Sequence, residues 1–195
     1  RQSNPFPSSS IIILTISSGF TGKLEQNKAV YRFTVDTTAD TNDSDLSNGI
    51  CADSQNKCSL RAAIQQINAL PSSSDSISLP PGTYSLNSGL PVLMNPLTLE
   101  GSGASGLNPT LITTTAGLTS GLTLQSNSMI RGVKINNFAN GIWVSKDNPV
   151  FENCVINGNI KGINIVGGAN AINVTIRTSM IKENTKGIWM EGGTA

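Results

Sequence analysis

The sequence predicts a mainly β protein: a right-handed parallel β-helix, or solenoid, with a helix-containing cap and a strand-forming arm at its N-terminal end. Two observations lead to this prediction. The 195 residues are rich in Gly, Ser, Thr and Asn but only 5% aromatic, which suits short strands joined by polar turns. The last third also contains an internal repeat. We expect an arm over residues 1–32, a disulfide-tied cap over 33–89 and β-helix coils over 90–195.

The repeat has three imperfect copies, which align on Gly141, Gly162 and Gly187. They read VKINNFANGIWV (133–144), CVINGNIKGINI (154–165) and SMIKENTKGIWM (179–190). Each copy has an isoleucine six positions before its glycine and another directly after it; these are Ile135, Ile156 and Ile181, then Ile142, Ile163 and Ile188. We expect each set to stack as one interior column, with the glycines at bends of positive φ. An ordinary β-sandwich remains the alternative.

Asparagines also recur at equivalent positions of the repeat. Asn136 matches Asn157, and Asn159 matches Asn184. Stacked coils favour such ladders of like residues at their turns.

The segments before the repeat are predicted as strands and one helix. The apolar, β-branched IIILTIS after a Pro/Ser-rich tail favours a strand, and KAVYRFTVD (28–36) favours a second. Ser59 is a suitable N-cap for a helix whose apolar stripe runs from Leu60 to Leu70. DSISLPPGTYSL (75–86) is typical of two strands joined by a turn.

Composition limits the compartment and the partners. Cys51 and Cys58 flank a short polar loop and are expected to form a disulfide in an oxidising compartment; a reduced or metal-bound pair is the alternative. A net charge of +1 argues against nucleic acid, and no apolar run is long enough for a membrane span. The chain begins at Arg1 without a signal sequence, so we expect any export signal to have been removed or to lie outside this sequence.

Residues 33–86 also resemble a known segment. The matching residues are Phe33–Val35, Ala39–Thr41, Gly49–Cys51, Cys58–Arg61, Ala63–Ile64, Asn68–Ala69 and Pro81–Tyr84. They are similar to the CSLREA domain, an N-terminal segment of large exported bacterial and archaeal proteins that precedes right-handed parallel β-helix repeats. The resemblance implies architecture and export, and it implies no catalytic residues.

An acidic loop precedes the expected helix. Asp40, Asn42, Asp43 and Asp45 offer oxygen ligands to a possible Ca²⁺, the only cofactor we consider, although the EF-hand pattern is incomplete. Asx turns explain the same residues equally well. We expect Arg61 to pair with an aspartate of this loop.

Two tryptophans, Trp143 and Trp189, occupy equivalent positions and are expected to point outward as stacked aromatics. They would serve a protein contact or, less favourably, sugar binding. The chain has no histidine, and beyond Leu90 its acids are Glu100, Asp147, Glu152, Glu183 and Glu191. A glycosidase needs paired carboxylates, so we expect no enzyme.

The sequence therefore favours a non-catalytic, secreted structural or adhesive protein that assembles into filaments or a surface layer. The arm strand, with Ile11, Ile12, Ile13, Leu14 and Ile16, would add to a neighbouring subunit, or the coils would stack end to end. The alternatives are that the strand packs on its own chain and that the chain is a piece of a longer β-helix. The rival function is a carbohydrate-binding or polysaccharide-cleaving β-helix.

Overall fold

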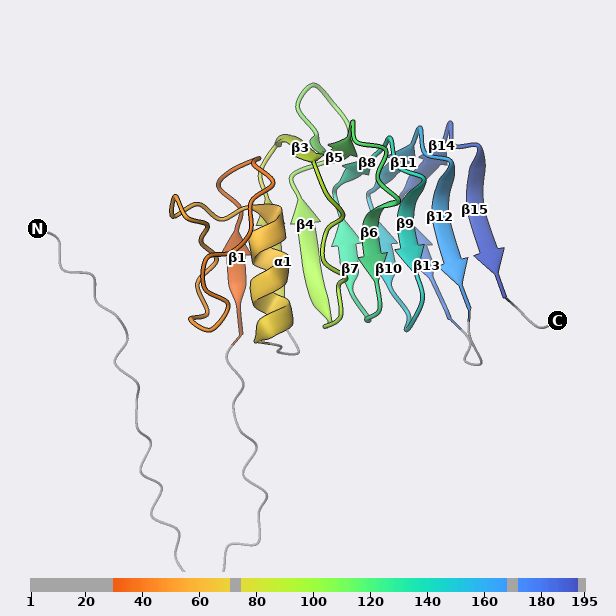
Figure 1. The fold of residues 1–195 in the computed structure, drawn as a ribbon. Coiled ribbons are helices and arrows are strands. Elements are labelled where there is room, and N and C mark those ends of the chain that lie inside the picture. The colour runs from red at the N-terminus through yellow and green to blue at the C-terminus, as the bar shows by residue number, and fades with distance from the viewer. Residues whose placement is uncertain (1–29, 71–74, 168–171, 193–195) are drawn as a thin grey trace, which may run out of the picture.

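The computed structural model describes residues 30–70, 75–167 and 172–192, and these residues form a parallel β-helix (Figure 1). Its strands belong to three parallel sheets, and every register pair joins a strand to the one below it in the stack. The predicted fold class is confirmed. The predicted arm strand over Ile11–Ile16 lies outside the described residues.

Each complete coil contributes one strand to each of three sheets. Sheet A contains β1 (Arg32–Thr34), β2 (Asp75–Leu79), β4 (Leu97–Gly101), β7 (Met129–Arg131), β10 (Val150–Glu152) and β13 (Thr175–Arg177). Sheet B contains β3 (Gly82–Leu86), β5 (Thr110–Thr114), β8 (Lys134–Ile135), β11 (Val155–Asn157) and β14 (Met180–Lys182). Sheet C contains β6 (Ser120–Leu124), β9 (Asn140–Val144), β12 (Lys161–Val166) and β15 (Lys186–Glu191). The coils thus include residues 75–86, which the sequence analysis assigned to the cap.

Columns of apolar side chains form the core, as the repeat predicted. Ile135, Ile156 and Ile181 are in register in sheet B, and the column continues back through Ile112 to Tyr84. In sheet C, Leu122 lies in register with a second column, Ile142, Ile163 and Ile188. Sheet A adds Phe33, Ile77, Leu99, Ile130, Phe151 and Ile176. The register of both predicted isoleucine columns is confirmed, and their members are interior except Ile188, which is 50% exposed.

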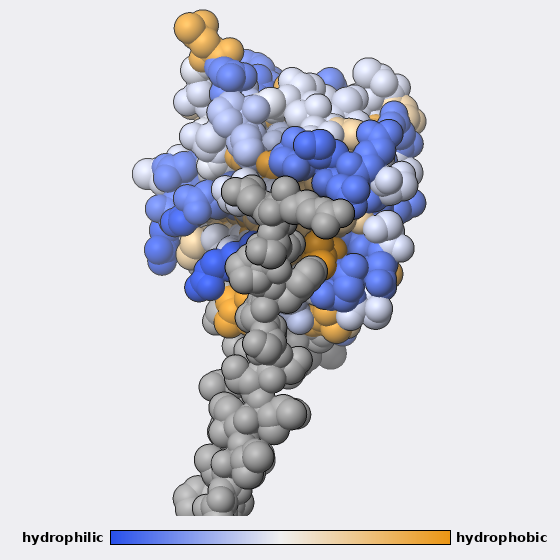
Figure 2. Space-filling model, turned by 90° about the vertical axis from the view of Figure 1, so that its left-hand side faces the viewer, coloured by the Kyte–Doolittle hydropathy of each residue, from blue (hydrophilic) through white to orange (hydrophobic). Residues whose placement is uncertain are grey.

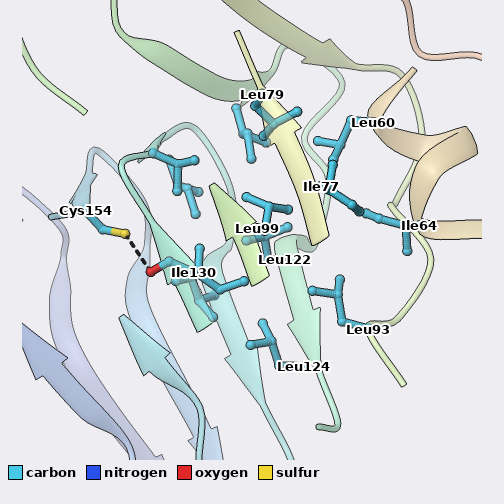
Figure 3. Close-up of a cluster of buried hydrophobic side chains, with 14 of the residues drawn as sticks. Leu60, Ile64, Ile77, Leu79, Leu93, Leu99, Leu122, Leu124, Ile130 and Cys154 are labelled. Carbon is cyan, nitrogen blue, oxygen red and sulfur yellow. Dashed lines mark hydrogen bonds between the residues drawn. The ribbon is translucent and has the colours of Figure 1, made fainter. Parts of the chain in front are cut away.

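Figure 3 shows how sheets A and C and the helix share one core, to which Ile112 and Ile135 of sheet B also belong. Ile77 and Leu99 from sheet A lie near Leu122 from sheet C, and Leu60 of the helix faces them from the N-terminal side. Cys154 is buried and free, and its Sγ lies 3.4 Å from the carbonyl oxygen of Ile130. Burial raises the pKa of this thiol, so Cys154 behaves as a core residue.

The helix α1 (Leu60–Ala69) covers the N-terminal end of the core. Ser59 is its N-cap and accepts a hydrogen bond from the Ala62 amide at 3.0 Å, as predicted. Its buried apolar side chains include Ile64 and Ile67, whereas Leu70 is the C-cap and only half-buried. Figure 2 faces this end of the molecule, where hydrophilic residues dominate the visible coloured surface. Among the described residues α1 is the one helix, and it is neither long nor apolar enough to cross a membrane.

The glycines that align the repeat are not at positive φ, and this expectation was wrong. A Cβ on Gly141 would lie 2.7 Å from the carbonyl oxygen of Gly162, and a Cβ on Gly162 would lie 2.6 Å from that of Gly187. The position is glycine because adjacent coils approach too closely there for any side chain.

Positive φ occurs instead in two other columns at the turns. Gly132, Asn153 and Thr178 form one column, with φ of 67°, 52° and 43°. Asn137, Gly158 and Glu183 form the other. Each column holds one glycine only. The other members of each column therefore adopt a left-handed backbone conformation that residues with a side chain disfavour.

Candidate functional site

The last described coil exposes residues that are buried in earlier coils. Ile142 and Ile163 are fully buried in sheet C, but Ile188, next in the same column, is 50% exposed. Met190, in register with the buried Ile165, is 69% exposed. β15 is the outermost strand of sheet C, and β12 is the one strand of the described part with which it pairs. The coil therefore presents an apolar strand with one unpaired edge.

The two tryptophans lie on the outer face of sheet C but do not stack on each other. Trp143 of β9 is in register with Asn164 of β12, which is in register with Trp189 of β15. One complete coil separates the indoles, about 10 Å at ordinary strand spacing. The predicted outward direction and equivalence hold, whereas the predicted aromatic stacking was wrong.

Trp189 is surrounded by charged groups. The Lys186 ammonium lies 3.4 Å from the centre of the Trp189 ring, and the indole N–H donates to Glu191 Oε1 at 2.9 Å. Lys161 also pairs with Glu191. The Lys161 hydrogen bond is the main cause that holds the pKa of Glu191 below its ordinary value, and donors from Trp189 and Asn164 add to it. These contacts fix Trp189 on the surface of its own coil.

Trp143 lies instead at the side of an open groove of 590 Å³. The groove runs between the outer face of sheet C and two loop segments at 89–90 and 118–120. Its lining residues are uncharged: Gly89, Leu90, Leu118, Thr119, Ser120, Thr123, Gln125, Trp143, Ser145 and Val166. Ser145 Oγ is buried without a hydrogen-bond partner.

The acidic loop is tied to the protein by hydrogen bonds at each predicted calcium ligand. Asn42 Oδ1 accepts from Gln65, Asp43 accepts from the amides of Asp45 and Ala52, and Asp45 accepts from Ser47. These are the Asx-type contacts that the alternative interpretation expected. In the described ranges no group of three or more His, Cys, Asp or Glu residues has a metal-binding arrangement.

Asp40, the fourth predicted ligand, forms a buried ion pair with Arg61. Arg61 Nε lies 2.8 Å from Asp40 Oδ1, and Nη2 lies 3.0 Å from Oδ2. The guanidinium also donates to the carbonyl oxygens of Ser88 and Gly89, each at 2.7 Å. Arg61 thereby holds one wall of the groove, and pairing with an aspartate of the loop is as predicted.

The same loop contains the predicted disulfide. Cys51 and Cys58 are bonded, with Cα atoms 5.0 Å apart. Disulfides persist mainly in oxidising compartments, which agrees with a location outside the cytoplasm.

The acids of the coils are distributed rather than clustered. Glu100, Arg131, Glu152 and Arg177 form a register column of alternating charge on sheet A, and Glu100 pairs with Arg131 at 2.8 Å. That pairing is the main cause that raises the pKa of Arg131 above its ordinary value. Arg131 belongs to β7, which lies between β4, the strand of Glu100, and β10, the strand of Glu152.

In comparisons with known proteins, no family model, no curated protein and no solved structure matches the chain. The resemblance to the CSLREA segment therefore stays a prediction, supported here by no independent match.

The sequence analysis missed the groove and Asn164. Asn164 stands at the tryptophan position in the middle copy of the repeat, so the alignment contained the signal. The groove had no such signal, because every lining residue except Trp143 lies outside the aligned copies.

Proposed function

We propose that this protein is a non-catalytic structural or adhesive protein of the extracellular space, which assembles by adding a strand of one copy to the last coil of another. The single observation that carries the proposal is the exposure of Ile188 and Met190 at positions that are buried in every earlier coil of sheet C. Burying them removes apolar surface from water, which is the main favourable term in association.

The unpaired edge of β15 also offers backbone groups to an incoming strand. Parallel edges of this kind bind extended segments by main-chain hydrogen bonds, while alternate side chains enter pockets. The edge is flanked on the inner side by Ile188 and Met190 and on the outer side by Trp189.

The segment IIILTIS has the pattern that such an edge requires. Ile12, Leu14 and Ile16 alternate with Ile11, Ile13 and Thr15, so an extended strand would direct large aliphatic side chains to one face. The inner columns of sheet C contain Leu, Ile, Val and Met at the equivalent places. This match of residue type supports the arm of a second copy as the incoming strand.

The carboxylates of the coils support a non-catalytic function. Glu100 pairs with Arg131, Glu183 with Lys182 and Glu191 with Lys161. A glycosidase needs one carboxyl that retains its proton beside a second that is ionised. The Lys161 hydrogen bond holds the pKa of Glu191 below its ordinary value, so Glu191 does not meet the first requirement.

The test is self-association of purified protein, measured by light scattering after size-exclusion chromatography and by electron microscopy. We expect polymers for the parent chain and monomers for a chain lacking residues 1–18, with the circular dichroism of a folded β-helix retained. Met190→Lys should likewise prevent assembly, because it places a charge on the exposed end of the core.

Ile160→Lys is the matched control. Ile160 is 57% exposed in the turn between β11 and β12, one coil before β15, so its substitution adds the same charge outside the exposed end of the core. It should leave assembly unchanged. Polymers that persist in the deletion variant exclude strand donation, and a parent chain that stays monomeric at all concentrations excludes the assembly proposal.

A further inference from the structure

The groove beside Trp143 has the chemistry of a ligand site that is separate from the assembly edge. Its volume of 590 Å³ lies within the range of small-molecule sites. No residue of β15 lines it, so it remains open whether or not a strand is added there.

The lining combines one aromatic face with several neutral polar groups. The indole of Trp143 projects from β9, and Leu90 and Val166 add apolar surface. Thr123, Gln125 and Ser145 supply two hydroxyls and an amide. Since no lining residue is ionisable, the groove is suited to a ligand without charge that has apolar faces and many hydroxyls.

The polar side chains of the groove differ in their access to a ligand. Ser145 Oγ is buried and makes no hydrogen bond, so the hydroxyl of Thr123 and the amide of Gln125 are the groups that would bond a ligand hydroxyl.

The part of the lining formed by Gly89 is held in place before any ligand binds. Arg61 donates to the carbonyl oxygens of Ser88 and Gly89, and Asp40 accepts from the amides of Asn87 and Ser88. A wall fixed in this way loses little conformational freedom on binding.

We propose that this groove binds a neutral oligosaccharide, with a sugar ring packed on the indole of Trp143 and its hydroxyls bonded to Thr123 and Gln125. The proposal separates the two tryptophans. Trp189 has its ring occupied by Lys186 and its N–H by Glu191, so it takes no part in binding.

The experiment uses the tryptophans as reporters, because the chain contains two. In Trp189→Phe the fluorescence comes from Trp143 alone, and in Trp143→Phe it comes from Trp189 alone. Each variant, with the parent chain, is titrated with neutral β-glucan, xylan and mannan oligosaccharides and with anionic oligogalacturonate. Calorimetry measures the same affinities independently.

We expect saturable binding of at least one neutral oligosaccharide, with a fluorescence change in Trp189→Phe and none in Trp143→Phe. Trp143→Ala should weaken binding by about tenfold or more, and Trp189→Ala should leave it within about twofold. Gln125→Ala should weaken binding without changing the thermal midpoint.

Three results would overturn the proposal. They are no binding of any neutral oligosaccharide to folded protein at millimolar concentration, preference for the anionic oligosaccharide, and equal loss of affinity in Trp143→Ala and Trp189→Ala. Binding of a hydrophobic dye without sugar would assign the groove to an apolar ligand instead. None of these results depends on self-association, so failure here leaves the assembly proposal to its own test.

Discussion

Replacing Gly162 with alanine should destabilise the fold, whereas the same change at Gly187 should not. A Cβ on Gly162 would lie 2.6 Å from Gly187 O, 2.8 Å from Asn184 Nδ2 and 2.9 Å from Ile181 Cγ2. A Cβ on Gly187 meets nothing nearer than Ile181 Cγ2 at 3.9 Å, an ordinary contact. The two glycines are equivalent in the repeat, so each serves as the control for the other.

The size of the effect follows from how little the neighbours can move. Asn184 Nδ2 is fixed by a hydrogen bond to Ile156 O at 2.9 Å, and the carbonyl of Gly187 belongs to a paired strand. Overpacking a rigid core costs about 1–3 kcal/mol. Alanine returns about 0.4–1 kcal/mol by restricting the unfolded chain. We therefore expect a net loss of about 1–2 kcal/mol for Gly162→Ala, and a change between zero and a gain of about 1 kcal/mol for Gly187→Ala.

Urea unfolding followed by circular dichroism measures both values. The midpoint should fall for Gly162→Ala at an unchanged slope, since the surface exposed on unfolding is the same. The measurement is made on monomers, because a side chain at position 187 points toward an added strand. Equal losses in the two variants would refute the steric explanation and indicate a backbone requirement for glycine.

Four further predictions concern the turns and the cap. Thr178→Gly should raise the free energy of unfolding by about 1 kcal/mol, because Thr178 has φ of 43°; an unchanged urea midpoint would contradict this. Arg61→Met should lower the free energy of unfolding by roughly 3 kcal/mol, since it leaves the buried Asp40 carboxylate unpaired, and Asp40→Asn in the same chain should recover part of that loss. Reducing the Cys51–Cys58 disulfide should cost about 2–3 kcal/mol, measured as the difference in urea midpoint with and without reductant. Hydrogen bonds from the Lys57 amide and the Thr41 hydroxyl hold the pKa of Asp53 below its ordinary value. The stabilisation by Asp53 is therefore present at neutral pH and is lost as the pH falls below about 4. The difference in free energy of unfolding between the parent and Asp53→Asn should close over that range.

The periodic part of the fold was predictable because stacking repeats one local environment. Ile135, Ile156 and Ile181 meet the same neighbours in successive coils, so their spacing in the sequence reports their contact in space. The ladder from Asn159 to Asn184 follows in the same way: Asn184 Oδ1 accepts from the Asn159 amide at 2.9 Å. In the preceding coil Phe138 takes this position, and its amide donates to Asn159 Oδ1.

The glycine positions could not be interpreted from the sequence alone. Glycine is required either where φ is positive or where two backbone segments approach closely. A repeat shows the same spacing of glycine in both cases. The distances around Gly141 and Gly162 identify the close approach. Positive φ is found instead at Asn153, a residue type that adopts it more readily than most, and at Glu183, whose side chain gives no sign of it.

The groove depends on contacts between segments that are distant in the sequence. Gly89 is held by Arg61, twenty-eight residues earlier, and it lines the groove together with Trp143. Periodicity carries no information about such a pair, because Gly89 lies outside the repeat. The charged contacts of Trp189 were also hidden, since Lys161 reaches Glu191 from the neighbouring coil.

The two proposed surfaces lie on different parts of the solenoid, and this placement connects them. Ile188 has the same residue type and repeat position as Ile163, so its exposure follows from its place in the last described coil rather than from its chemistry. An added strand would bury it and leave the groove at β6 and β9 open. A polymer built in this way would present one groove per subunit along its length. Because linked weak sites bind far more tightly than single ones, a modest affinity for sugar at each groove would suffice for adhesion. Trp143→Ala should therefore abolish retention of polymers on a sugar-coated surface while leaving polymer length unchanged, and shorter polymers in that variant would contradict the independence of the two surfaces.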